Sequence, residues 1–243
     1  MKVAAIVPAA GKGRRIKSKI GKPYIKLCGK PILAHTLARL SKNRHIKEII
    51  VAVDKKNIAK VKRFRIKNIK VVAGGRERKY SVLNALKKVS GNIDYVLIHD
   101  GVRPFLTDRL INASLRAARS FGASVVAVPV KPTLKCAGKG CRVAHTPDRT
   151  KFWEAQTPQV FKRNLIEKAY KDKAIGKKNI TDDSMLVELL GIKPKLVMGS
   201  YSNIKITTKE DLKLAKMLCV SRGRTSNSKC SRFGLSKRGD ICA

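Results

Sequence analysis

Short apolar runs alternate with amphipathic segments along most of the chain. Apolar runs of strand length, rich in Val, Ile and Ala, occupy residues 3–7, 48–54, 69–73, 95–99 and 123–130. Between them, apolar residues recur every three or four positions at 31–40, 78–89 and 108–121, which predicts helices with one buried face. Apolar strands that alternate with such helices predict an α/β fold, with a mostly parallel sheet flanked by helices.

The pattern changes after residue 130. Residues 133–136 and 141–146 flank a glycine-containing turn and predict a β-hairpin. A hairpin this small has no core of its own, so it packs either on a second subunit or back on its own domain. Further strands are predicted at 154–161, interrupted by Pro158, and at 195–198 and 203–207.

Two more helices and a tail complete the predicted organisation. One helix begins at 181–184, and another begins after Thr208, where Asp211 completes a capping-box pattern. From residue 221 the composition shifts to Ser, Gly, Arg and Lys, which predicts a disordered tail. We therefore expect one domain at 1–220, with a protruding β-arm at about 131–152, and a basic tail at 221–243.

The charge of the chain favours anionic partners. Lys and Arg number 55 against 16 Asp and Glu, which gives a formal net charge of +39. Nucleotides, phosphorylated metabolites, nucleic acids and acidic membranes all match this balance. The basic residues are spread along the whole chain and aromatic residues make up only 5% of it, whereas a nucleic-acid site is typically a concentrated patch with stacking aromatics. We therefore expect no nucleic-acid partner.

Neither a secretory signal nor a membrane span is expected. The apolar run at 3–10 is short, contains Pro8 and precedes the nearest basic cluster instead of following it. The six cysteines form no C-x-x-C pair, which favours free thiols in a reducing cytoplasm. A redox or zinc role for Cys136 and Cys141 is the alternative.

The loop after the first strand has the composition of a phosphate-binding loop. It reads Pro8-Ala9-Ala10-Gly11-Lys12-Gly13-Arg14-Arg15, and Lys22-Pro23 follows shortly after. Glycines allow a ligand to approach the backbone, and arginines offer forked donors to phosphate oxygens. Neither the Walker A spacing nor the dinucleotide fingerprint is present. The alternative is an ordinary turn with solvated basic residues.

Two other polar clusters are predicted to lie beside this loop. Gly74-Gly75 follows the predicted strand at 69–73, and Asp100-Gly101 follows the strand at 95–99. Because the carboxyl ends of parallel strands meet at one edge of a sheet, these clusters and the loop form one candidate ligand site.

These motifs together resemble the 2-C-methyl-D-erythritol 4-phosphate cytidylyltransferase family. The resemblance covers residues 1–219 and continues, in order, through the motifs Ala73–Arg76 with Ser81, His99–Pro104, Ala144–Arg149, Gln156–Gln159, Ile180–Asp183 and Asn203–Thr207. It implies a Rossmann-like nucleotidyltransferase domain and a homodimer embraced by the β-arm. It also implies transfer of CMP from CTP to 2-C-methyl-D-erythritol 4-phosphate with Mg²⁺, which releases pyrophosphate in the non-mevalonate isoprenoid pathway.

The resemblance also implies residue roles. Arg15 and Lys22 would stabilise the transition state, and Arg149 and Lys205 would position the substrate phosphate. CTP binding is implied for Pro8, Ala9, Ala10, Gly11, Gly13, Gly75, Ser81, Asp100, Gly101 and Arg103. Contacts to the methylerythritol phosphate are implied for Thr133, Arg149, Thr157, Thr181 and Lys205, with Thr133 and Arg149 acting in the neighbouring subunit's site. Asp100 is the expected contact for Mg²⁺ or the ribose.

One departure keeps alternatives open at this stage. Ser202 stands where the family commonly has an aspartate that contacts substrate hydroxyls. A cytidylyltransferase for ribitol 5-phosphate, or another pentitol phosphate, is therefore the alternative within the same class. The high charge and the basic tail also fit a nucleotide- or RNA-binding protein without turnover.

Overall fold

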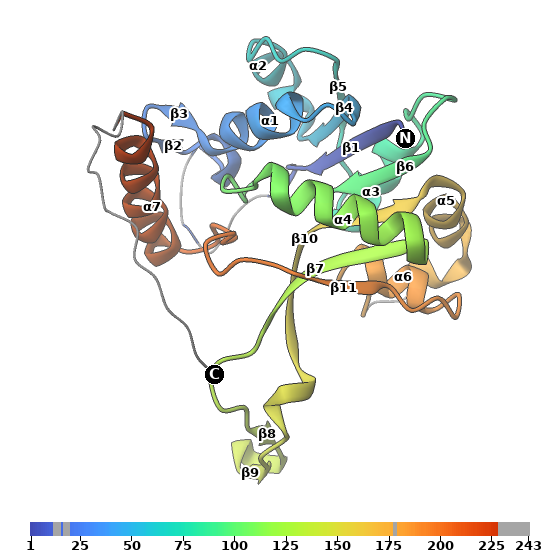
Figure 1. Cartoon of the computed structure of the whole chain (residues 1–243), viewed down its shortest axis with the longest axis vertical. Coiled ribbons are helices and arrows are strands. Elements are labelled where there is room, and N and C mark those ends of the chain that lie inside the picture. Colours follow the sequence, from blue (N-terminus) through green and yellow to red (C-terminus); the bar gives the residue numbers. More distant parts are fainter. Residues whose placement is uncertain (12–15, 17–19, 177–178, 228–243) are drawn as a thin grey trace, which may run out of the picture.

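The core of the protein is a seven-stranded sheet covered by helices on both faces (Figure 1). A computed structural model describes residues 1–11, 16, 20–176 and 179–227. The strand order is β11-β7-β10-β6-β1-β4-β5. Their bounds are β1 (Val3–Pro8), β4 (Ile46–Val53), β5 (Ile69–Ala73), β6 (Tyr95–Ile98), β7 (Ala123–Pro129), β10 (Trp153–Lys162) and β11 (Lys195–Met198). This arrangement confirms the predicted α/β class.

All strand pairs of this sheet are parallel except those made by β10, which runs antiparallel to β6 and β7. The central strand β1 pairs with β4 and β6, and Ile6 lies opposite Ile50 and Ile98. Residues 3–7 are completely buried. This burial on both faces explains why the run is continuously apolar instead of alternating.

The helices divide between the two faces of the sheet. Their apolar residues cluster in two groups, one with α1 (Ile32–Lys42), α2 (Ile58–Lys62) and α4 (Asp108–Phe121), the other with α3 (Arg78–Leu86), α5 (Arg163–Lys171) and α6 (Asp183–Glu188). Successive strands of a parallel sheet feed helices to both sides in this way. As predicted, Thr107 caps α4, because its side chain accepts a hydrogen bond from the backbone N–H of Leu110.

A third, smaller apolar cluster lies beside the sheet. It joins the final helix α7 (Lys209–Asn227) to the short strands β2 (Lys26–Leu27) and β3 (Lys30–Pro31) and includes Leu27, Ile206 and Ala215. The predicted capping box of α7 is confirmed, since Thr208 N–H donates to Asp211 and Asp211 N–H donates back to Thr208. Short 3₁₀ helices complete the described fold: η2 (Lys22–Tyr24), η3 (Lys55–Asn57), η4 (Lys139–Cys141), η5 (Arg149–Lys151) and η6 (Lys173–Gly176).

The prediction of a strand at 203–207 is wrong. No strand is assigned there, although the segment is held in place at both ends. Ile206 N–H donates to Val102 O at 3.0 Å, and Asn203 N–H donates to Ser200 O at 2.9 Å. Buried side chains of Asn203 and Ile206, instead of a strand ladder, hold this segment against the sheet edge.

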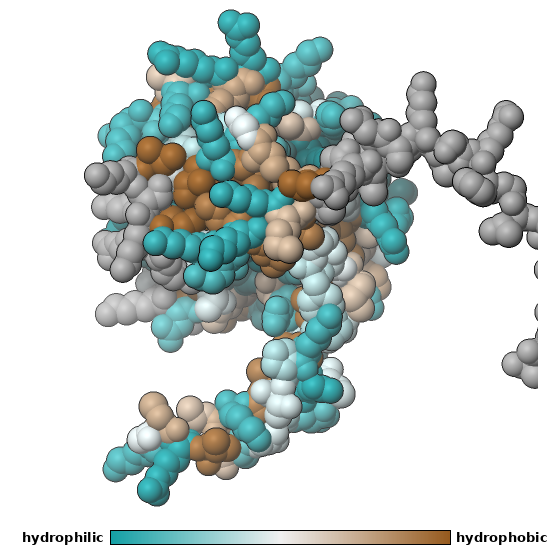
Figure 2. All heavy atoms as spheres, turned by 90° about the vertical axis from the view of Figure 1, so that its left-hand side faces the viewer, coloured by the Kyte–Doolittle hydropathy of each residue, from teal (hydrophilic) through white to brown (hydrophobic). Residues whose placement is uncertain are grey.

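The predicted hairpin is present as a separate two-stranded antiparallel sheet of β8 (Cys136–Ala137) and β9 (Val143–His145). Figure 1 shows it at the far end of β7 and β10, and Figure 2 shows this segment extending away from the body of the molecule. Most of residues 131–152 are exposed. Within the single chain, the hairpin therefore does not fold back onto its own domain.

The described part of the chain ends in α7. The helix α7 continues to Asn227, past the point where composition predicts disorder and across the expected domain limit at residue 220. The rest of the predicted tail, residues 228–243, lies outside the described residues. In the part of the chain that the structure describes, no helix has the length and apolar content needed to cross a membrane.

Candidate active site

A cavity of about 560 Å³ lies at the carboxyl ends of β1, β4, β5 and β6. It is the cavity that the strand-end rule predicts, because each of these strands contributes the residues that follow it. Its lining consists of Pro8, Ala9, Ala10, Gly11, Lys22, Pro23, Asp54, Gly75, Arg76, Glu77, Arg78, Ser81, Asp100, Val102 and Lys205. We refer to it as the Asp100 cavity.

Most of the residues expected at the nucleotide site line this cavity. They are Pro8, Ala9, Ala10, Gly11, Gly75, Ser81 and Asp100, together with the expected catalytic residues Lys22 and Lys205. The fold thus brings together residues as far apart in the chain as Pro8 and Lys205. The expected site residues Gly13 and Arg15 lie outside the described residues.

The glycine pair after β5 is required by close packing. A Cβ on Gly75 would lie 2.4 Å from the Cβ of Tyr80, and one on Gly74 would lie 2.4 Å from the Cβ of Ala10. Ser81 is buried, and its hydroxyl accepts from Gly75 N–H at 3.0 Å and donates to Glu77 O at 3.1 Å. The Ser81 side chain therefore fixes the shape of the loop that lines the cavity.

Asp100 is the electrostatic centre of the cavity. One carboxylate oxygen accepts from Arg78 Nε at 3.1 Å, while the other lies 2.8 Å from Lys205 Nζ and 3.5 Å from Arg103 Nε. Burial opposes ionisation of this carboxyl, but the three cations outweigh it and hold its pKa well below the usual range. Even with Asp183, which also contacts Arg78, three cations face two carboxylates, and this excess positive charge suits a polyanionic ligand.

Sequence reasoning missed Arg78, which joins two parts of the site. Besides Asp100, its guanidinium contacts buried Asp183 in the first turn of α6, with Nη1 2.7 Å from Oδ2. Burial lowers the pKa of Arg78, but Asp183 and Asp100 more than compensate and raise it. A signal was present in the sequence: an arginine at the first residue of a helix is unfavourable to the helix dipole and indicates a nearby anion.

A buried hydrogen-bond chain supports the backbone at Asp100. His99 Nε2 lies 3.1 Å from Arg103 O, so this nitrogen carries the proton and donates. His99 Nδ1 then accepts from the Thr157 hydroxyl at 3.0 Å, and that hydroxyl oxygen accepts from Asp100 N–H at 3.1 Å. Burial lowers the pKa of His99 to about 4, which keeps it neutral. Thr157, expected to contact substrate, is 4% exposed and has its hydroxyl engaged here.

Two other residues expected to bind CTP lie behind the cavity instead of lining it. Arg103 is buried, and its Nη1 donates to Asn203 O at 2.7 Å. Asn203 in turn donates to Thr157 O at 2.9 Å. Gly101 packs so closely that a Cβ there would lie 3.0 Å from the Cβ of Ala9. Both residues therefore shape the site from behind through Asp100, Asn203 and the loop after β1.

Lys205 lines the Asp100 cavity. The other residues expected to bind the second substrate do not line it within one chain. Thr133 and Arg149 are exposed in the segment that carries the hairpin, and Arg149 Nη1 donates to Lys131 O. Thr181 is also exposed and lines a separate hollow beside α6. Ser202 lies in the turn before Asn203, with its hydroxyl 2.8 Å from that of Ser200.

The donor set at Asp100 fits Mg²⁺ only together with phosphates. Among the described residues, no group of three or more His, Cys, Asp and Glu side chains has the arrangement of a metal site. Mg²⁺ commonly binds through one or two protein carboxylates plus substrate phosphates and water. A single buried carboxylate in a cavity that favours polyanions matches this kind of site, in which substrate phosphates and water supply the other ligands.

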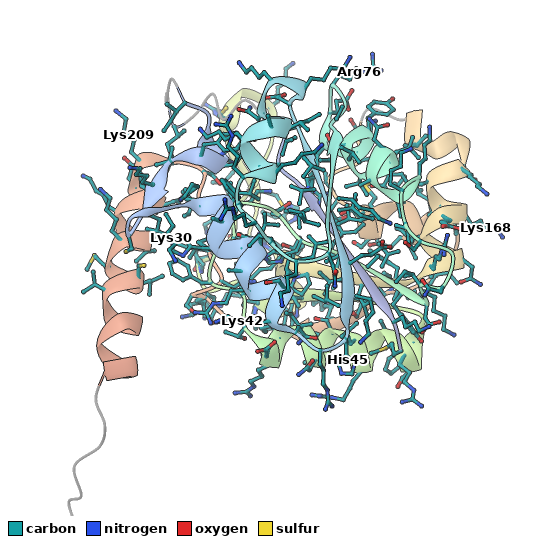
Figure 3. The ribbon with its side chains drawn as sticks, turned by 90° about the horizontal axis from the view of Figure 1, so that it is seen from above. Lys30, Lys42, His45, Arg76, Lys168 and Lys209 are labelled. Carbon is teal, nitrogen blue, oxygen red and sulfur yellow. The ribbon has the colours of Figure 1, made fainter. Side chains whose placement is uncertain are left out.

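Basic residues away from the cavity lie on several elements. Figure 3 shows Lys30, Lys42, Lys168 and Lys209 on different elements of the described structure. This dispersal is typical of a general surface bias.

Comparisons with known proteins point to one family. The family model described as 2-C-methyl-D-erythritol 4-phosphate cytidylyltransferase matches residues 3–221. A protein of that name from Clostridioides difficile (strain 630) is 46% identical over 226 residues, covering 88% of this chain and 92% of the relative. Another, from Alkaliphilus metalliredigens (strain QYMF), is 45% identical over 217 residues, covering 87% of this chain and 90% of the relative.

Solved structures give the same result for the fold. The 4-diphosphocytidyl-2C-methyl-D-erythritol synthase from Anaerococcus prevotii DSM 20548 superposes with a TM-score of 0.81 at 36% identity, covering 90% of this chain and 96% of that one. The 2-C-methyl-D-erythritol 4-phosphate cytidylyltransferase from Thermus thermophilus gives a TM-score of 0.76 at 31% identity, covering 90% and 100%. The sheet described above is thus the Rossmann-like sheet of these enzymes.

Proposed function

Because the chain belongs to the 2-C-methyl-D-erythritol 4-phosphate cytidylyltransferase family, we propose that the Asp100 cavity is where it binds CTP. The enzyme transfers the CMP moiety of CTP to 2-C-methyl-D-erythritol 4-phosphate, giving 4-diphosphocytidyl-2-C-methyl-D-erythritol and pyrophosphate in the non-mevalonate isoprenoid pathway. The observation that carries the site proposal is the buried Asp100 carboxylate, held between Arg78 and Lys205 at the sheet edge.

The reaction needs positioning and charge stabilisation more than a protein base. A phosphate oxygen of the acceptor attacks the α-phosphorus of CTP, and the bond to the β-phosphate breaks. A phosphomonoester has its second pKa near about 6, so its oxygen is largely ionised at neutral pH. Catalysis then depends on bringing two polyanions together and stabilising the charge that develops at the α-phosphate.

The cations of the cavity are proposed for that task. Lys205 lies at the cavity wall with Nζ 2.8 Å from Asp100, so Asp100 orients an ammonium toward the site. Lys22 lines the part of the cavity that follows the loop from β1. Together with Arg15, which lies outside the described residues, Lys22 is proposed to stabilise the transition state, while Lys205 positions the acceptor phosphate.

Asp100 and the phosphates of CTP are proposed to hold Mg²⁺. When bound, the ion neutralises phosphate charge and acts as a Lewis acid at the reacting phosphoryl group. Both Asp100 oxygens are engaged by cations, but the Lys205 side chain is 40% exposed and is the partner most able to move aside. Asp100 would then balance the charge of Lys205 before the metal binds and the charge of the metal afterwards.

The second substrate is proposed to bind between two subunits. Thr133 and Arg149 lie on the exposed hairpin segment, away from the Asp100 cavity of the same chain. In a homodimer held by the β-arm, these residues would complete the neighbouring site together with Thr181 and Lys205. A closed two-fold arrangement would give two equivalent sites.

A cytoplasmic location is proposed as well. Cys28, Cys136 and Cys141 are free thiols, in agreement with a reducing compartment.

Pyrophosphate release from CTP and Mg²⁺ with 2-C-methyl-D-erythritol 4-phosphate tests the site proposal. Lys205→Met and Lys22→Ala are expected to lower kcat by about 100-fold or more, because each removes a charge that stabilises or positions the phosphates. Lys209→Ala, an exposed change nearby in sequence, is the control. Ribitol 5-phosphate serves as the competing acceptor. Full activity of Lys205→Met would refute the proposed site.

Mixing inactive variants tests the shared site. In a dimer of one Arg149→Met chain and one Lys205→Met chain, one of the two sites has both native residues if Arg149 acts across the interface. Mixed subunits should then regain activity that neither variant has alone. No recovery after demonstrated subunit exchange would contradict a site that spans the dimer.

A further inference from the structure

A second cavity, of about 680 Å³, adjoins the Asp100 cavity. The two share Ala9, Gly11, Pro23 and Asp54 as lining residues. The other lining residues of the second cavity are Ile20, Gly21, Tyr24, Lys55, Lys56, Asn57 and Lys60. We refer to it as the lysine cavity. Because Gly11 and Pro23 line both, it begins beside the part of the Asp100 cavity that contains Lys22.

The lysine cavity gathers positive charge with little compensation. Lys55 and Lys56 lie in η3, directly after Asp54, and Lys60 lies in α2. Among the described residues, none of these three lysines takes part in an ion pair, and Asp54 is the one acidic residue of the lining. Three clustered ammonium groups raise the local potential, which an anion would lower.

Tyr24 forms a buried wall of this cavity. It is 5% exposed, and Lys60 Nζ lies 4.7 Å from the centre of its ring, within cation–π distance. The hydroxyl is buried without a hydrogen-bond partner in the described structure. Burial and nearby Asp54 raise the pKa of Tyr24 to about 12, so the hydroxyl keeps its proton. A buried donor without an acceptor calls for an explanation, and a bound anion supplies one.

We propose that the lysine cavity binds the pyrophosphate released by the transfer reaction, as a site on its way out of the enzyme. This inference rests on the proposed function of the Asp100 cavity. In the reaction, the acceptor oxygen forms a bond to the α-phosphorus, and the α–β bridging oxygen leaves with its electron pair as part of pyrophosphate. The product is then a free polyanion at the boundary that the two cavities share.

The type of cation also fits a product that must leave. Lysine is a flexible point charge without the rigid two-point geometry of arginine, so it attracts phosphate without fixing one orientation. Lys55 and Lys56 are exposed on a short 3₁₀ helix, next to bulk solvent. Lys60 is exposed as well, and its ammonium group lies beside the Tyr24 ring. A path of exposed cations from the shared boundary to bulk solvent would lower the barrier to release.

The test compares two triple variants of the full chain with the same change in charge. One is Lys55→Ala/Lys56→Ala/Lys60→Ala, and the other changes Lys42, Lys62 and Lys67 to Ala, all exposed and none of them lining either cavity. Calorimetry measures pyrophosphate binding, and steady-state kinetics measure product inhibition by pyrophosphate and the KM for CTP.

The cavity triple is expected to weaken pyrophosphate binding about tenfold, since each exposed ion pair contributes only modestly. The KM for CTP is expected to stay within about twofold. Equal weakening in the control triple would overturn the proposal in favour of general surface charge. A matching rise in the KM for CTP would overturn it in favour of the phosphates of the substrate.

Tyr24→Phe tests the hydroxyl separately, because it keeps the ring beneath Lys60. Pyrophosphate binding is expected to weaken several-fold, and an unchanged affinity would remove the hydroxyl from the site. Calorimetry needs no turnover, so failure of the proposed function would show as absent CMP transfer in the wild-type chain, independently of these binding results.

Discussion

The guanidinium of Arg78 lies 2.7 Å from the carboxylate of Asp183 and thereby joins the start of α3 to the start of α6. Asp183 is almost completely buried, and its other oxygen accepts from the Tyr170 hydroxyl. Arg78 also reaches Asp100 at 3.1 Å. One arginine thus connects the Asp100 cavity to the helix that follows Thr181, a residue expected to contact the acceptor.

Replacing Arg78 should destabilise the protein and reduce catalysis together. Arg78→Gln leaves Asp183 as a buried charge without its cation, which costs about 3–5 kcal/mol. It also removes one of the three cations that contact Asp100. We therefore expect kcat/KM to fall by at least about 100-fold, mainly through a lower kcat. Urea unfolding and steady-state kinetics measure the two effects.

The neighbouring Arg76→Gln is the control for the stability effect, because the Arg76 side chain is 79% exposed. It should change the free energy of unfolding by no more than about 0.5 kcal/mol. Equal stability of the two variants would show that the Arg78–Asp183 contact contributes nothing to the fold.

Thr157 offers a clear choice between a structural and a substrate-binding role. Thr157→Val keeps the shape but removes the hydroxyl that links His99 to Asp100 N–H, so unfolding free energy should fall by about 1–3 kcal/mol. Thr157→Ser keeps the hydroxyl and should restore most of that loss. If Thr157→Val instead keeps full stability and raises only the KM for the acceptor, the hydroxyl contacts substrate.

His99 makes the fold sensitive to mild acid. Its pKa falls from 6.5 to about 4 on folding, so between these values the unfolded chain binds a proton that the folded chain does not. Stability therefore decreases as pH falls from 6.5 toward 4, by up to about 3 kcal/mol. Asp100 changes the stability of the protein in the same direction. Because its pKa is lowered in the folded state, its contribution to stability is lost as the pH falls still further.

Unfolding in urea at several pH values measures this effect. His99→Asn should show a shallower dependence between pH 4 and 6.5 than the wild type, whatever its stability at neutral pH. His145→Asn, a change at an exposed histidine, should keep the wild-type slope. Identical slopes for all three proteins would mean that His99 titrates normally in the folded state.

Two glycines of the cavity should respond differently to one added methyl group. A Cβ at Gly75 would lie 2.4 Å from Tyr80 Cβ, so Gly75→Ala must displace the start of α3 and should cost about 1–3 kcal/mol. At Gly11, no atom of the described residues other than its chain neighbours lies within 4 Å of the added Cβ, so Gly11→Ala should leave the melting temperature nearly unchanged. Thermal unfolding compares them, and a reversed order would show that the loop after β5 is not tightly packed.

Much of the fold was predictable because burial imposes a pattern on each strand. The apolar run at 69–73 coincides with β5, and the run at 195–198 with β11. The segment at 203–207 has similar composition but forms no strand, because its position depends on Val102 and on the buried Asn203. A local pattern cannot show whether a neighbouring strand is available to pair with.

Sequence alone determined the architecture and the residues at the ends of β1, β5 and β6, since strand periodicity and the parallel arrangement place Pro8–Gly11, Gly75 and Asp100 at one edge. Only the tertiary structure decided which cations surround Asp100 and that His99 and Thr157 support its backbone. It also separated Arg103 from the cavity lining and revealed the lysine cavity beside it. The physical reason is that hydrogen bonds, ion pairs and cavities depend on distances between residues far apart in the chain, which no sequence pattern encodes.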